Sequence, residues 1–162
     1  MKKIVCCMLI AMLLVSAACA EVASLSDVLF RSAKEALYCL ATGDYERIVI
    51  SLPFSDVSPS ADEWRSFAQG SFSSLSGSIP QQQYAVAYWQ GGCWKLAVPV
   101  SEPSSDWVET LVLVSEDGYS FCGYGCAPWA QVRSEYQSAE YVRWNEEYLG
   151  GTSVVIEFDQ QR

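Results

Sequence analysis

The sequence predicts an α+β fold in which N-terminal helices pack on a curved antiparallel sheet, with an additional C-terminal helix. Two observations support this class. Apolar residues recur at helical spacing in the first part of the chain, and strand-like segments joined by short turns follow from Gln83 onward. Helices followed by a run of strands are typical of an α+β domain, because the helices can cover one face of the sheet.

Two helices are expected at the start of this domain. Residues 24–42 carry one apolar stripe, with Ser24 placed to cap the helix and Gly43 placed to end it. Asp44 can cap a short helix over residues 45–52. The β-branched run in the middle of that segment also suits a strand, so both structures stay open there.

A third helix is the best-marked element of the chain. Ser60 and Glu63 form a capping-box pattern, in which the hydroxyl and the carboxylate each satisfy a backbone N–H of the first turn. Apolar residues follow at helical spacing from Trp64 onward, and Gly77 is placed to end the helix.

Four strands of an antiparallel meander are expected next, since Gly91-Gly92 and Asp117-Gly118 provide short turns. Their ranges are 84–89, 93–100, 107–115 and 119–122.

After a loop over residues 123–128, the pattern predicts a helix from Trp129 to Leu149 and a last strand over residues 152–158.

The order of helix, short helix, helix and four strands resembles the NTF2-like superfamily, which has the cystatin-like arrangement. The similarity covers residues 24–126, and Gly43-Asp44-Tyr45 after the first helix is a feature common there. The resemblance implies a pocket between the helices and the concave sheet. The helix from Trp129 departs from the usual plan, in which the chain ends in strands. Members include enzymes, pocket binders and assembly modules, so the resemblance implies no function.

Residues 1–20 are interpreted as a secretory signal peptide. Lys2 and Lys3 precede an apolar run over residues 4–15, and Ala18-Cys19-Ala20 is an A-x-A cleavage site. The run is too short for a membrane span, which needs about 20 residues. The expected mature protein is a single α+β domain over residues 21–162, secreted or periplasmic, without a transmembrane span.

A bacterial lipoprotein signal is the alternative. Residues 15–19 resemble a lipobox, although Ser16 stands where Leu is usual, and Cys19 would then carry the lipid. A lipidated Cys19 would tether the domain to a membrane.

Charge and composition exclude several functions. The chain has 19 acidic and 10 basic residues, and loss of Lys2 and Lys3 changes the net charge from −9 to −11 (8 − 19). The remaining cations are scattered, which argues against nucleic acid as a partner. The chain has no His, so Ser-His-Asp and Cys-His catalytic sites are excluded. No cofactor is expected.

Four cysteines remain beyond the signal: Cys39, Cys93, Cys122 and Cys126. In an exported domain they predict at least one disulfide, with three pairings open, and buried free thiols are the alternative. Cys122 with Cys126 would close a local loop, and Cys39 with Cys93 would join the first helix to the sheet. No C-x-x-C pair is present, so neither a metal site nor a redox pair is predicted.

Aromatic side chains are the candidate binding residues, although most aromatics in strands and helices fill the core. Tyr88, Trp94 and Trp107 are the first candidates for lining a pocket. Tyr141, Trp144 and Tyr148 share one face of the predicted last helix and are candidates for a partner-binding face.

Glu109 is the weak catalytic candidate, because it stands inside an apolar strand, where burial would raise its pKa. A solvated face, or a pair with Lys95 across the sheet, would explain it without catalysis.

Three functions stay open at this point. The first is an exported, non-catalytic domain that binds a small molecule or an envelope protein through an aromatic pocket or face. The second is an isomerase or hydrolase that uses Glu109 as acid or base. The third is a cell-envelope assembly subunit or lipoprotein.

Overall fold

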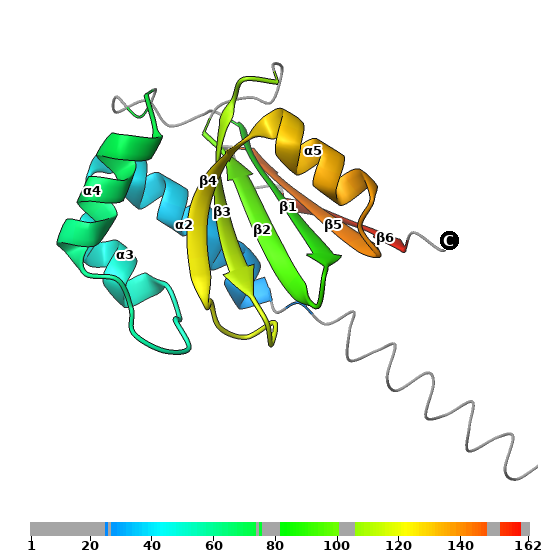
Figure 1. Cartoon of the computed structure of the whole chain (residues 1–162), viewed down its shortest axis with the longest axis horizontal. Helices are drawn as coiled ribbons and strands as arrows, with labels where there is room; N and C mark the ends of the chain where they lie inside the picture. Colours follow the sequence, from blue (N-terminus) through cyan, green and yellow to red (C-terminus); the bar gives the residue numbers. More distant parts are fainter. Residues whose placement is uncertain are drawn as a thin grey trace, which may run out of the picture.

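The structure is a computed structural model, and it describes residues 25, 27–73, 75, 82–100, 106–148 and 153–159. A six-stranded antiparallel sheet has the strand order β4-β3-β2-β1-β5-β6. Helices α2, α3 and α4 lie on one side of this sheet, and α5 lies across the opposite face (Figure 1). The predicted α+β class is therefore confirmed.

The helices are α2 (Asp27–Thr42), α3 (Tyr45–Ser51), α4 (Ala61–Ser71) and α5 (Trp129–Gln137). The strands are β1 (Gln82–Gln90), β2 (Cys93–Pro99), β3 (Glu109–Ser115), β4 (Gly123–Pro128), β5 (Tyr141–Tyr148) and β6 (Ser153–Asp159).

Three helix ends that the sequence marks, at Gly43, Asp44 and Ser60, are confirmed. Gly43 has a φ of 75°, a left-handed conformation that favours glycine after a helix. The Asp44 carboxylate accepts from the backbone N–H of Arg47 at 3.3 Å. Ser60 Oγ accepts from the N–H of Glu63 at 3.3 Å, and Glu63 Oε2 accepts from the N–H of Ser60 at 2.7 Å. Local capping chemistry therefore sets these boundaries.

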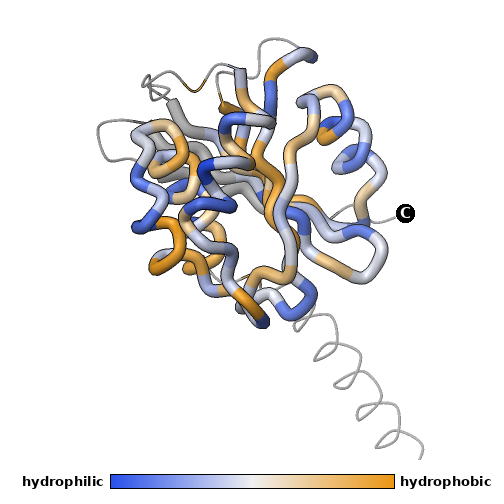
Figure 2. The backbone as a smooth tube through the Cα atoms, turned by 60° about the vertical axis from the view of Figure 1, so that its left-hand side comes forward, coloured by the Kyte–Doolittle hydropathy of each residue, from blue (hydrophilic) through white to orange (hydrophobic). Residues whose placement is uncertain are grey.

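The main core lies between the three N-terminal helices and the sheet. Ala85 and Ala87 on β1 leave room for α2 to approach closely, as their size predicts. Trp64 of α4 is fully buried against Tyr124 of β4, with the ring centroids 4.3 Å apart. Figure 2 shows the apolar segments concentrated along the central strands, with polar stretches towards the outside.

A second, smaller core holds α5 on the opposite face. Alternate residues of β1, Val86 and Tyr88, point to this side. Tyr136 of α5 packs between two tryptophans, with ring centroids 6.0 Å from Trp129 and 5.2 Å from Trp144. These aromatic contacts hold α5 against the sheet. Pro128, which precedes the helix, supplies no side-chain cap.

The helix expected from Trp129 to Leu149 is wrong in its second half. It ends at Gln137, and β5 follows, paired with β1 on one side and β6 on the other. The aromatic spacing fits a helix, but Val142 faces the second core in a strand conformation, and the backbone hydrogen bonds to two neighbours favour that strand. In the described chain, α5 is therefore followed by two strands, β5 and β6.

The fourth strand is displaced from its expected range of 119–122 to Gly123–Pro128, which the sequence indicated as a loop. The Asp117 carboxylate accepts from the N–H groups of Tyr119 and Ser120, at 2.8 Å each, and so extends the turn beyond Gly118. α4 also ends at Ser71, earlier than the expected Gly77.

The predicted signal peptide, with Cys19 and Ala20, lies outside the described residues. None of the helices within those residues is both long and apolar enough to span a bilayer.

The turn at Asp117 gives a pH-dependent prediction. Hydrogen bonds from Tyr119, then Ser120, lower the pKa of Asp117 to about 2, against about 3.9 in an unfolded chain. The stability from these bonds should be fully present above about pH 3.9 and lost as the pH falls through about 2. The free energy of unfolding of the wild type should fall as the pH drops through this range. In Asp117→Asn we expect this fall to be smaller, by less than about 1 kcal/mol because the group is exposed. Urea unfolding measures this; identical pH slopes would contradict it.

Candidate functional site

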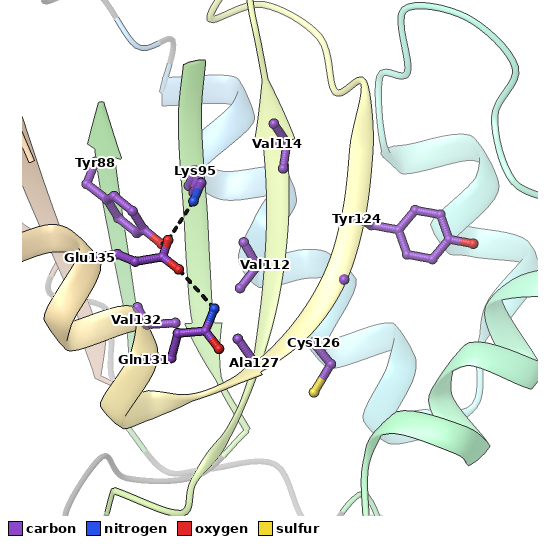
Figure 3. A pocket seen from close by; sticks show the side chains of 11 residues that line it. Tyr88, Lys95, Val112, Val114, Tyr124, Cys126, Ala127, Gln131, Val132 and Glu135 are labelled. Carbon is purple, nitrogen blue, oxygen red and sulfur yellow. Dashed lines mark hydrogen bonds and ion pairs between the residues drawn. The ribbon is translucent and has the colours of Figure 1, made fainter. Parts of the chain in front are cut away.

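A cavity of about 260 Å³ lies on the α5 face of the sheet, between α5 and strands β2, β3 and β4 (Figure 3). Its apolar walls are Val112 and Val114 of β3, Ala127 of β4 and Val132 of α5. The volume is slightly below the range of about 300–1,000 Å³ that is usual for ligand pockets, so the cavity suits only a small molecule.

The cavity exists because β4 carries small residues where its side chains would fill it. Gly125 pairs with Val112, and a Cβ placed on Gly125 would meet nothing within 4 Å. Its φ is not positive, so no backbone strain calls for glycine there. The large side chain of β4, Tyr124, points away from the cavity and joins the main core (Figure 3).

One end of the cavity is a polar cluster centred on the Glu135 carboxylate. Glu135 Oε2 accepts from Lys95 Nζ at 2.6 Å and from the Tyr88 hydroxyl at 2.9 Å, and Oε1 accepts from the Gln131 amide at 3.0 Å. Figure 3 shows these side chains turned towards one another from β1, β2 and α5. The cluster therefore joins α5 to two central strands.

The hydrogen bonds stabilise the ionised form of the Glu135 carboxyl group. Partial burial opposes its ionisation, but the bonds from Lys95, Gln131 and Tyr88 outweigh it and hold the pKa of the carboxyl below its usual value. Burial, then the bond to Glu135, raises the pKa of Tyr88 far above its ordinary range. Near neutral pH, neither group is poised to exchange a proton.

The three predicted pocket aromatics lie in different places. Tyr88 is buried and lines the α5-face cavity, whereas the resemblance implied a pocket under the N-terminal helices. Trp94 is buried in the main core, with ring centroids 5.5 Å from Trp89 and 5.4 Å from Tyr141. Trp107 is 89% exposed and does not line the cavity.

The predicted partner face does not form. Tyr141 packs against the main core, while Trp144 packs against the second core on the other side of the sheet. Residues three apart share a face of a helix but lie on opposite faces of a strand. The side chain of Tyr148 is not among those that the structure describes.

Glu109 has a local structural role. Its carboxylate accepts from the Ser73 N–H and from the Ser73 hydroxyl, both at 2.8 Å, just after α4. Lys95, its expected cross-sheet partner, is instead paired with Glu135.

The predicted disulfides are wrong for the described residues, where all four cysteines are free thiols. Cys39 lies in the main core, whereas Cys93 precedes Trp94 on β2 and so points to the opposite face of the sheet. Cys122 and Cys126 are four residues apart along an extended segment, about 13 Å at the usual strand rise, and a disulfide needs Cα atoms within about 7 Å.

A second hollow, of about 280 Å³, lies on the outer surface of α2 near the end of α3 and includes Val28, Arg31 and Ser51. Glu35 at its edge is paired with Arg47 at 2.5 Å. Val28 is 61% exposed, so this hollow is a shallow surface feature. The α5-face cavity is the better candidate because it combines apolar walls with a partly buried polar cluster.

The cysteine geometry predicts a definite alkylation pattern. Cys122 and Cys126 are exposed, and Cys39 is fully buried. Burial, then the neighbouring Glu35 carboxylate, raises the pKa of the Cys39 thiol to about 11. Because the thiolate is the reactive form, iodoacetamide should modify Cys122 and Cys126 first and Cys39 only after unfolding. Peptide mass spectrometry without reductant measures this; cysteines that react only after reduction would contradict it.

Comparison with protein-family models, with curated proteins and with solved structures finds no match to this chain.

Proposed function

We propose that this chain is an exported, non-catalytic binding domain and that the α5-face cavity is its ligand site. The observation that carries the proposal is the Lys95–Glu135 pair at the end of an apolar cavity. Apolar walls with a few placed polar groups are typical of small-molecule sites.

The enzymatic alternative has less support. Glu109 is hydrogen-bonded to the segment after α4 and does not line the cavity. Glu135 does line the cavity, but its lowered pKa suits a permanently ionised partner of Lys95 rather than an acid or base. The assembly alternative has lost its proposed surface, because Tyr141 and Trp144 lie on opposite faces of the sheet.

An NTF2-like relationship remains part of the proposal. Three N-terminal helices followed by an antiparallel meander support it. The cavity, however, lies on the face away from these helices, where Tyr88 and Val132 point. A ligand site on that face would be a departure from the pocket that the resemblance implies.

Binding is tested with the neutral fluorescent ketone Prodan and two matched substitutions. Ala127 lines the cavity, whereas Ala130 is exposed on α5 and does not. Ala127→Leu should fill the cavity and weaken Prodan binding by about tenfold or more, equivalent to about 1.4 kcal/mol. Ala130→Leu should leave binding unchanged. Fluorescence titration measures both.

Gly125→Val separates binding from folding. The added side chain enters open space and favours a strand, so the free energy of unfolding should hold or rise while Prodan binding falls. Equal Prodan affinity in the wild type and both cavity variants, or no saturable binding to the wild type, would refute the cavity as the site.

Export is tested by the intact mass of the protein from its native host. Cleavage after Ala20 should leave a chain that begins at Glu21, and a lipoprotein would begin at an acylated Cys19. The mass of the uncleaved chain would overturn the export proposal.

A further inference from the structure

We propose that the ligand of the α5-face cavity is a small neutral molecule with an apolar body and a carbonyl oxygen that accepts a hydrogen bond from Lys95. This inference rests on the proposed function and specifies the chemistry of the same site.

The cavity is electrically neutral although it contains a cation. Lys95 supplies the positive charge, and Glu135 cancels it at 2.6 Å. No other charged residue lines the cavity. The whole chain carries a formal charge of −9, so its long-range field repels anions. A carboxylate or phosphate ligand would have to compete with Glu135 for Lys95 against that field.

The polar end still offers hydrogen-bond donors. A lysine ammonium carries three N–H donors, and the bond to Glu135 uses one of them. The Tyr88 hydroxyl already donates to Glu135 and is buried, so it offers no further donor. Lys95 is therefore the group from which a ligand oxygen can accept.

Gln131 adds the complementary group. Its amide N–H donates to Glu135 Oε1, which turns the nitrogen towards that carboxylate and leaves the amide oxygen as an acceptor at the cavity edge. A primary amide on the ligand matches this pair, with its carbonyl at Lys95 and its N–H₂ at Gln131. The apolar body would lie against Val112 and Val114, over the backbone of Gly125.

Three probes with one ring and different charges test the inference: benzamide, benzoate and benzamidinium. Amide-shift titrations by NMR on the whole mature chain should place benzamide at the cavity, with several-fold tighter binding than either charged probe. The amide shifts that benzamide causes should not depend on salt concentration, because neither benzamide nor the cavity carries a net charge.

Lys95→Met keeps the length of the side chain and removes the donors. It should weaken the binding of benzamide about fivefold, the equivalent of one ordinary hydrogen bond, while Lys95→Arg should keep most of the affinity for benzamide. Thermal unfolding of each variant verifies that the fold persists; if Lys95→Met unfolds, the order of the three probes on the wild type decides.

The outcomes separate the two proposals. Tighter binding of benzoate or benzamidinium at the cavity, or equal benzamide affinity in folded Lys95→Met, overturns the inference and leaves the binding function standing. Absence of shifts at the cavity with all three probes overturns the inference, and absence of Prodan binding as well overturns the function.

Discussion

The pairing of β5 with β1 is the constraint on which the rest of the structure depends. A meander of β1 to β4 alone would have β1 at its edge and one covered face. The pairing of Tyr88 with Val142 and of Val86 with Trp144 makes β1 a central strand, and apolar residues on both of its faces are buried. Ala85 and Ala87 accommodate α2 on one face, and Val86 and Tyr88 receive α5 on the other. The second core, the cavity and its polar cluster all follow from that arrangement.

The elements that the sequence predicted well are those with local chemical signals. Ser60 and Glu63 mark the start of α4, Asp44 marks α3, and the Gly91-Gly92 turn has φ values of 63° and 84°, as a tight hairpin requires. The elements predicted poorly depend on distant partners. Residues 141–148 fit a helical template, but pairing with two strands outweighs that local preference.

The candidate site could not be predicted from the sequence for the same reason. Lys95 and Glu135 are 40 residues apart, and nothing in their neighbourhoods indicates that they meet. Glu135 lies within a predicted helix of ordinary polarity, whereas the apolar neighbours of Glu109 make it the catalytic candidate in the sequence. The sequence nonetheless contains a signal: the alternation of Gly123, Gly125 and Ala127 indicates a strand with no side chain larger than a methyl group on one face, which leaves space beside it.

The protonation states within the polar cluster are the reason why the proposed function is binding rather than catalysis. A general acid or base needs a pKa near the working pH, which in a carboxyl group requires burial without compensating partners. Glu135 has three donors instead, which lower its pKa, while burial, then the bond to Glu135, raises the pKa of Tyr88. Both groups therefore keep fixed protonation states near neutral pH. The cluster supplies orientation: Glu135 holds Lys95 and Gln131 at one end of an apolar cavity, which is the arrangement that the proposed ligand site requires.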